Sequence, residues 1–395
     1  MYTQCWHCDR LSKRVIKREF RMLNINTLGF FSGGGGLDLG FSAAGYNIIF
    51  SSDIDAHSCE TLKLNQGKKA YVNEHPVLCE DVQKINKATI KGIIGDKNID
   101  FVIGGPPCQS FSVFGRRKGL EDPRGNLVFE YVRLIKELKP RGFLFENVAG
   151  LKSIHGGELY RELTKVLSMD GRYKVSVHEY EVAEHGIPQF RKRIFFIGSL
   201  EGKEIPPMMP THAQKNVLDF GFKPFNTVKK ALTGLPRPIT DWKSEVYING
   251  HVGRKHSQLI IDRYTSLIHG ERDHKTRINK LDPNKPSYTI IVGSDAGGGK
   301  GHIHPFEPRE VTPRESARIQ TFPDWWEFYG TGRHIIRQVG NAVPPLFGAL
   351  IANHVAKEMF AINTERNIDD FIDILDLEFF KSVDNRSLQP QNTLK

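Results

Sequence analysis

Cys108 is the side chain with the clearest capacity for covalent chemistry, and it stands in the run Gly104–Ser112, GGPPCQSFS. The apolar residues Ile99–Ile103 before this run predict a buried strand, and two prolines stiffen the chain directly before the cysteine. Because strands of an open parallel sheet end at the ligand crevice, we expect Cys108 at the mouth of that crevice. A free cysteine is more often a small buried apolar residue, but the Gly, Pro, Gln and Ser neighbours argue against burial here. Cys108 is therefore a candidate nucleophile.

Basic side chains follow Cys108 in the same predicted loop. A thiol with a pKa of about 8.5 becomes a thiolate only in a cationic or polar neighbourhood. We expect the basic residues to stabilise the thiolate, to hold phosphate groups, or to do both; they are Arg116, Arg117, Lys118 and Arg124. The glycine-bounded stretch 115–125 can also close over a substrate, as catalytic lids do.

A carboxylate and two arginines are further candidates. Glu146 comes at the end of the apolar run 142–145, and burial of a lone carboxylate raises its pKa and favours the form that donates a proton. Arg191 and Arg193 share one face just before the predicted strand 194–197. They form a solvated basic face, or they point into the crevice as ligands for phosphate, carboxylate or a base oxygen. A structural pairing of Glu146 with Arg191 is the alternative to a catalytic role.

A glycine cluster precedes all of these residues. Gly33–Gly36 joins the predicted strand 27–32 to a predicted helix at 37–44, and Asp53 ends the next apolar run. Glycines at such a junction allow close approach to a ligand, and an acid about twenty residues later can bind ribose hydroxyls. The pair indicates a nucleoside-containing cofactor. A turn without a ligand is the alternative, since the dinucleotide spacing G-x-G-x-x-G is not matched cleanly.

These residues must be positioned by an α/β fold. Short apolar runs alternate with amphipathic stretches such as 127–138 up to about Gly198, which predicts a mostly parallel sheet with helices on both faces. Beyond Gly198 the alternation is lost, which predicts a second, smaller domain. The expected division is a basic extension at 1–24, a catalytic and cofactor-binding domain at 25–200 plus 335–362, a smaller domain at 201–334, and an acidic tail at 363–395.

Composition narrows the class of partner. The net charge of +10 over 395 residues favours a polyanion, nucleic acid first. Five scattered cysteines do not form a disulfide framework, and the Cys5–Cys8 pair lacks the second pair of a zinc site, so we expect no metal. Without a long uninterrupted apolar run or a secretory signal, we expect a cytoplasmic protein and no membrane contact.

Taken in order, the motifs resemble those of the DNA (cytosine-5)-methyltransferases of bacterial restriction–modification systems, from about Leu28 to Ala356. The matching segments are Phe31–Leu37, Pro107–Gln109, Glu146–Val148, Gln189–Arg193, Pro313–Arg318 and Gln338–Pro344. Four consecutive glycines depart from the family pattern, and both chain ends lie outside it.

The resemblance implies a Rossmann-like, S-adenosylmethionine-dependent methyltransferase fold with 201–334 as the target-recognition domain. It implies that Cys108 attacks C6 of a flipped-out cytosine, that Glu146 contacts N3 and the exocyclic amine, and that Arg193 holds the base oxygen. Arg191 supports the site. Both the covalent adduct and base flipping suit cytosine, whose C5 is a poor nucleophile until C6 is attacked.

The resemblance also assigns binding residues. Phe31 packs on the adenine of S-adenosyl-L-methionine and Asp53 binds its ribose. The other implied cofactor residues are Ser32, Gly33, Gly35, Leu37, Ile54, Asp81, Val82, Pro107, Leu127, Asn341 and Val343. The implied contacts to double-stranded DNA are Gln109, Ser112, Arg116, Arg117 and Arg124. A companion restriction endonuclease is an expected partner.

Three alternatives remain at this point. A tRNA cytosine-5 methyltransferase shares the scaffold, but its Cys-Phe-Thr signature is missing, since no cysteine follows Cys108. An inactive DNA-binding regulator would not need Cys108, Glu146, Arg191 and Arg193 together. A nicotinamide-dependent enzyme fits the glycine spacing poorly and leaves the cysteine loop without a purpose.

Overall fold

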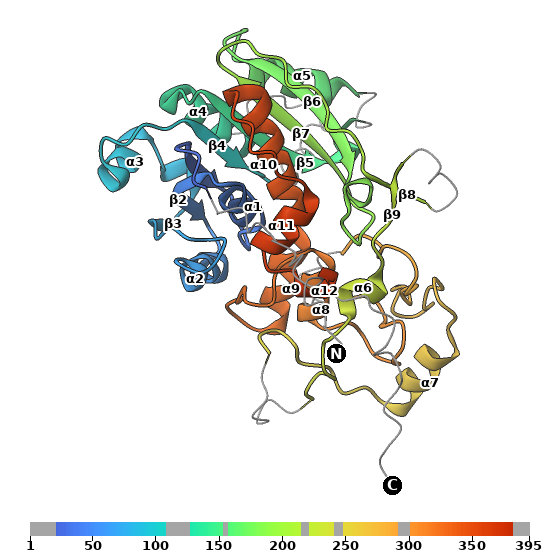
Figure 1. The fold of residues 1–395 in the computed structure, drawn as a ribbon. Coiled ribbons are helices and arrows are strands. Elements are labelled where there is room, and N and C mark those ends of the chain that lie inside the picture. The colour runs from blue at the N-terminus through green and yellow to red at the C-terminus, as the bar shows by residue number, and fades with distance from the viewer. Residues whose placement is uncertain are drawn as a thin grey trace, which may run out of the picture.

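A seven-stranded sheet forms the centre of the computed structural model, which describes residues 21–107, 127–152, 157–214, 221–240, 248–290 and 301–381. The strand order is β3-β2-β1-β4-β5-β7-β6 (Figure 1). The first five strands in this order are parallel to one another, whereas β7 is antiparallel to both β5 and β6. The prediction of an α/β fold with a mostly parallel sheet is confirmed.

Most strands lie where apolar runs predicted them. The strands are β1 Asn26–Phe30, β2 Asn47–Asp53, β3 Val77–Cys79, β4 Phe101–Gly104, β5 Gly142–Val148, β6 Lys174–Glu181 and β7 Lys192–Ser199. β6 was not predicted from the sequence. It is an edge strand whose sequence, KVSVHEYE, mixes apolar and polar residues and is only partly buried, so it lacks the apolar run of the central strands.

Alternating side chains of the sheet enter two separate cores. On β4, Phe101 and Ile103 enter one core and Val102 enters the other. Helices cover both faces, with α3, α4 and α5 on one face and α1, α10 and α11 on the other (Figure 1). Their bounds are α1 Gly36–Ala44, α3 Lys87–Ile94, α4 Leu127–Leu138, α5 Glu158–Ser168, α10 Pro345–Phe360 and α11 Ile368–Ile374. The result is a three-layer αβα arrangement.

The late part of the chain returns to the first helix. α9, Gly332–Asn341, leads into α10, which packs on α1 where Gly40 faces Gly348. Among the described residues, the stretch Gly332–Phe360 has the length and apolar composition of a membrane span, but 78% of its apolar window is buried inside the protein. It therefore serves as core structure between the sheet and the helices beside it.

The described residues of the region 201–334 hold little regular structure. Their elements are β8 His212–Ala213, β9 Lys223–Pro224, α6 Val228–Leu232, α7 Gln258–Ser266 and α8 Pro313–Ile319. Tyr264, Ile278 and Ile303 form a small core of their own, whereas Ala317 and Trp326 belong to the core that also holds α1 and α10. The division of this region into a separate domain thus remains a prediction.

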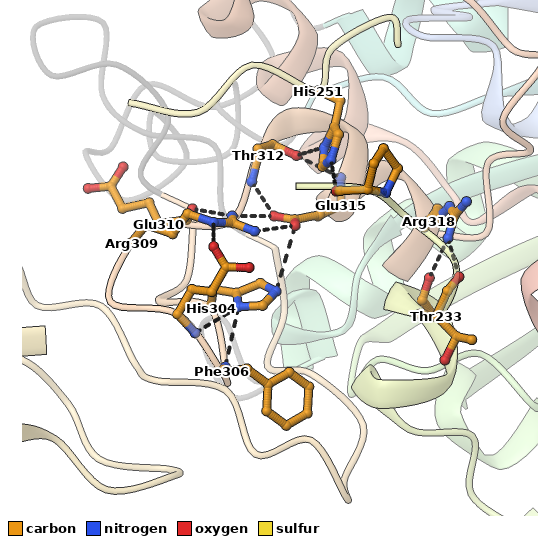
Figure 2. Close-up of polar contacts among 12 residues, drawn as sticks. Thr233, His251, His304, Phe306, Arg309, Glu310, Thr312, Glu315 and Arg318 are labelled. Carbon is orange, nitrogen blue, oxygen red and sulfur yellow. Dashed lines mark hydrogen bonds and ion pairs between the residues drawn. The ribbon is translucent and has the colours of Figure 1, made fainter. Parts of the chain in front are cut away.

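A buried polar network fixes the start of α8 (Figure 2). Thr312 and Glu315 form a capping box, and Arg309 donates two hydrogen bonds to the Glu315 carboxylate, at 2.7 and 2.9 Å. Nδ1 of His251 lies 2.9 Å from Oγ1 of Thr312, and Nε2 of His304 lies 3.7 Å from Glu315. Burial raises the pKa of Glu315, but Arg309 outweighs it and holds that pKa below its usual range. Loops distant in sequence are thereby tied to one helix end.

The predicted acidic tail begins as packed structure. α11 and the short α12, Glu378–Lys381, bury Phe371, Phe379 and Phe380 in the same core as α10. The amphipathic pattern of this stretch therefore reflects core packing.

The contact between α1 and α10 should tolerate no side chain at Gly40. A Cβ there would lie 2.7 Å from backbone atoms of Gly348 and Pro345, so Gly40→Ala forces the helices apart. We expect a loss of about 1–3 kcal/mol in the free energy of unfolding, measured by urea denaturation. Gly92→Ala is the matched control, because Gly92 is also helical but faces open space, and it should stabilise by up to about 1 kcal/mol. Equal effects of the two variants would contradict close packing at Gly40.

Candidate active site

A cavity of about 620 Å³ opens at the carboxyl ends of the parallel strands. Glycine-loop residues, the acid after β2, the turn after β4 and the end of β5 all contribute to its wall. The predicted cofactor residues that line it are Phe31, Ser32, Gly33, Leu37, Asp53, Ile54, Asp81, Val82, Pro107, Leu127, Asn341 and Val343. Segments from both ends of the chain thus meet in one site.

Gly35 is the predicted cofactor residue that does not line this cavity. It has φ +82°, and a Cβ on it would lie 2.6 Å from the Trp326 ring. Gly36 lines the cavity, and its missing side chain lets the Val343 carbonyl approach within 2.2 Å of the would-be Cβ. The two glycines therefore serve different purposes. Gly35 allows close packing of Trp326, and Gly36 allows the approach of the segment that carries Val343.

The acidic turn after β2 is held by backbone hydrogen bonds. Oδ2 of Asp53 accepts from the Gly33 amide at 2.8 Å, and Oδ1 accepts from the Asp55 amide at 2.9 Å. Burial raises the pKa of Asp53, and these two amides oppose that rise. Ile54 lies beside it on the cavity wall with 70% of its surface exposed. The turn thus presents a fixed carboxyl group next to an uncovered apolar side chain.

Asp38 lies beneath the glycine loop and is fully buried. Its Oδ1 accepts hydrogen bonds from the hydroxyls of Ser32, at 3.0 Å, and Ser51. Burial raises the pKa of Asp38 to about 6 in spite of these bonds. No role was predicted for Asp38 from the sequence, although it follows the glycine cluster by only two residues.

Glu146 and Arg193 form an ion pair at the inner wall of the cavity, with Nε of Arg193 2.9 Å from Oε1 of Glu146. In the pairing of β5 with β7, Glu146 lies opposite Phe195 and Arg193 lies opposite Val148, so Glu146 and Arg193 are diagonal neighbours, and both side chains are largely buried. Burial raises the pKa of Glu146, while Arg193 and Arg191 oppose the rise. A Cβ on Gly105 would lie 2.9 Å from Oε2 of Glu146, so a larger residue there would displace the Glu146 carboxyl group. The geometry places a carboxyl group whose pKa is raised by burial beside a fixed cation.

The turn after β4 is held against β5. Nδ2 of Asn147 donates to the Pro106 carbonyl at 3.2 Å, and Pro107 lines the cavity. Cys108 directly follows Pro107 in the sequence but lies outside the described residues. The same holds for the predicted DNA contacts Gln109, Ser112, Arg116, Arg117 and Arg124.

Arg191 does not pair with Glu146. It is fully buried, and its Nη2 donates to the carbonyls of Gly340 and Ala342, at 2.7 and 3.1 Å. Burial lowers the pKa of Arg191 to about 9. Arg191 therefore positions the late segment that carries Asn341, and it does not itself line the cavity.

Several residues that line the cavity were not predicted as site residues from the sequence. Arg337 and Gln338 come from α9, and Asp55 and Ser58 come from the start of α2, Ala56–Asn65. Nη2 of Arg337 lies 2.6 Å from Oδ1 of Asp55. The signal available in the sequence was adjacency alone, since Asp55 lies two residues after Asp53 and Arg337 directly precedes Gln338, the first residue of a matching motif.

Comparisons with known proteins give one family. The model of the C-5 cytosine-specific DNA methylase family matches residues 25–359. The Type II methyltransferase M.XorII of Xanthomonas oryzae pv. oryzae is 33% identical over 366 residues, which cover 83% of this chain and 84% of that protein. The Type II methyltransferase M1.HphI of Haemophilus parahaemolyticus is 32% identical, over 85% of this chain and 87% of that protein.

Solved structures agree in fold. The crystal structure of a prophage-encoded DNA modification methyltransferase of E. coli superposes with a TM-score of 0.67 at 30% identity, over 85% of this chain and 99% of that chain. The S. pombe Dnmt2 methyltransferase has a TM-score of 0.59 at 19% identity, over 84% of this chain and 98% of that chain, a likeness of fold alone. The predicted methyltransferase fold is confirmed.

The titration of Asp38 should make stability depend on pH. Because the folded-state pKa of about 6 exceeds the ordinary 3.8, the contribution of this group is present below pH 3.8 and is lost as pH rises through 6. Asp38→Asn keeps an acceptor for both serines but does not titrate. We expect the unfolding free energy of the wild type to fall relative to this variant by about 2 kcal/mol between pH 4 and pH 7. Parallel denaturation curves at all pH values would contradict the buried, titrating Asp38.

Proposed function

We propose that this chain, which belongs to the C-5 cytosine-specific DNA methylase family and is a DNA (cytosine-5)-methyltransferase, takes its methyl group from S-adenosyl-L-methionine. When bound, this cofactor supplies an electrophilic methyl group on sulfur. The chain modifies a specific duplex sequence in the cytoplasm, as part of a restriction–modification system with a companion endonuclease. The names of the relatives as Type II methyltransferases support this role.

The cavity fits the cofactor in its chemistry. The Asp53 carboxylate is fixed by two amides and lines the cavity, where it can accept hydrogen bonds from ribose hydroxyls. Ile54, Phe31 and Val82 provide apolar surface for an adenine ring, and the 70% exposure of Ile54 leaves it available for such a cover. Asn341 and Val343 also line the cavity.

The Glu146–Arg193 pair beside the Pro106–Pro107 turn is the observation that carries the proposed cytosine chemistry. Glu146, whose pKa is raised by burial, donates a proton toward N3 of a flipped-out cytosine. Arg193 holds the base oxygen with its remaining N–H groups. Protonation at N3 makes C6 electrophilic, so these two residues prepare the ring for attack.

Cys108 completes the proposed reaction. Its thiolate would form a bond to C6, and the electron pair of the C5–C6 double bond would become available at C5 for the electrophilic methyl group that the bound cofactor supplies. The methyl–sulfur bond would break in that transfer and leave S-adenosyl-L-homocysteine. Loss of the C5 proton to a base and of the thiolate from C6, with return of the N3 proton to Glu146, would restore the double bond and give 5-methylcytosine. Region 201–334 recognises the target sequence, and the basic residues after Cys108 hold DNA phosphates.

Cys108→Ala should abolish methyl transfer while leaving cofactor binding nearly unchanged. We expect incorporation of radiolabelled methyl groups into duplex DNA to fall by more than about 10³-fold, because the alternative, direct methylation of an unactivated C5, is slow. Calorimetric binding of S-adenosyl-L-homocysteine should stay within about twofold of wild type, since Cys108 is not a proposed cofactor contact. Cys5→Ala is the control, and full activity of Cys108→Ala would disprove the mechanism.

DNA that contains 5-fluorocytosine should trap the enzyme. With fluorine in place of hydrogen, C5 carries no proton for a base to remove, so the adduct between Cys108 and C6 persists after methyl transfer. We expect a denaturant-stable complex on gels, with the modified peptide identified by mass spectrometry, and none for Cys108→Ala.

Mapping 5-methylcytosine in plasmid DNA and in tRNA after expression identifies the site, and methylation of tRNA alone would overturn the DNA substrate.

A further inference from the structure

We infer that Arg337 is a positioning residue for the methyl donor. It binds the Asp55 carboxylate and thereby holds the Asp53–Asp55 turn in place. This inference rests on the proposed use of S-adenosyl-L-methionine. Arg337 lines the cavity but is not one of the proposed cofactor contacts.

A chain of short contacts connects Arg337 to the acid of the cofactor site. Nη2 of Arg337 lies 2.6 Å from Oδ1 of Asp55, and the Asp55 amide donates to Oδ1 of Asp53 at 2.9 Å. Oδ2 of Asp53 accepts from the Gly33 amide at 2.8 Å. A shift of Asp55 therefore moves the amide that orients the Asp53 carboxylate in the cavity.

Asp55 divides its two oxygens between two tasks. Oδ2 caps α2 by accepting from the amide and the hydroxyl of Ser58, at 3.0 and 2.9 Å. Oδ1 accepts from Arg337, and Nδ1 of His57 lies 3.8 Å from the same oxygen. The cap alone fixes the start of α2 relative to its own chain, whereas Arg337 fixes it relative to α9, 282 residues later.

α9 is itself held firmly, so Arg337 has a fixed base. At the end of α9, Arg191 binds the carbonyls of Gly340 and Ala342. Near its start, the His334 ring stacks on His57 with centroids 3.7 Å apart and planes at 12°. Arg191 thus joins the end of α9 to the start of β7, and the ring contact joins the first turn of α9 to the start of α2.

Charge points the same way as geometry. Asp53 and Asp55 are close enough for the charge of Asp55 to raise the pKa of Asp53. Arg337 compensates the Asp55 charge, so its loss leaves an unpaired anion beside the ribose-binding carboxylate. Ion pairs with this degree of exposure, 41% for Arg337 and 23% for Asp55, usually contribute little to global stability. The expected effect is therefore on donor affinity rather than on folding.

The experiment measures calorimetric binding of S-adenosyl-L-homocysteine to the full chain. Arg337→Ala should raise the dissociation constant about five- to tenfold, as expected for loss of one charge-assisted hydrogen bond. Because only one N–H of Arg337 contacts Asp55, Arg337→Lys should recover most of the affinity. Asp55→Asn keeps the helix cap, since Asn caps as well as Asp, but removes the charge. Arg337→Ala should have little further effect in the Asp55→Asn background.

Lys68→Ala is the matched control. The Lys68–Glu327 ion pair, at 2.7 Å, also joins the segment after α2 to the late chain and is similarly exposed, but neither residue lines the cavity. It should leave donor affinity unchanged. Wild-type affinity in Arg337→Ala would overturn the inference. A full effect of Arg337→Ala in the Asp55→Asn background would also overturn it, because Arg337 would then contact the donor directly. Failure of the wild type to bind would instead overturn the proposed cofactor.

Discussion

The buried guanidinium of Arg191 is the constraint on which the site depends. A cation removed from water must find acceptors, and Arg191 finds them in the carbonyls of Gly340 and Ala342 at the end of α9. These bonds attach a segment near residue 340 to the entrance of β7 in the central sheet. Asn341 and Val343 then line the cavity, with the Val343 carbonyl packed against Gly36 of the loop after β1. The two hydrogen bonds thereby hold together a site assembled from both ends of the chain.

Burial also sets the protonation chemistry of the cavity. Desolvation raises the pKa of Asp38, Asp53 and Glu146, but each carboxyl is bound differently. Asp38 accepts from serine hydroxyls, Asp53 from backbone amides, and Glu146 from the guanidinium of Arg193. The first is suited to a structural role and the second to hydrogen bonding with a neutral ligand. The third places a carboxyl group with a raised pKa directly beside a cation.

Glycines make the close approaches in this arrangement possible. Gly36 admits the Val343 carbonyl, Gly105 admits the Glu146 carboxylate, and Gly40 admits α10. In each case the neighbouring atom comes from a different part of the chain, so the glycine is required by packing between segments. A glycine cluster after the first strand therefore indicates close contact, and only the contacts show whether a ligand or another segment is the neighbour.

The sequence by itself determined the element types and the candidate chemistry. The central strands and the helices α1 and α4 were predictable because apolar runs of the right period are bounded by glycine or polar residues, and Asp53 and Glu146 were recognisable as acids at strand ends. The tertiary structure decided the partners. It gave Glu146 the partner Arg193 through the antiparallel pairing of β5 with β7, and it left β6 to form at an edge without an apolar run. It also brought Arg337 to Asp55 across 282 residues. Local sequence encodes local conformation, whereas such contacts depend on how the layers pack, which no short stretch of sequence specifies.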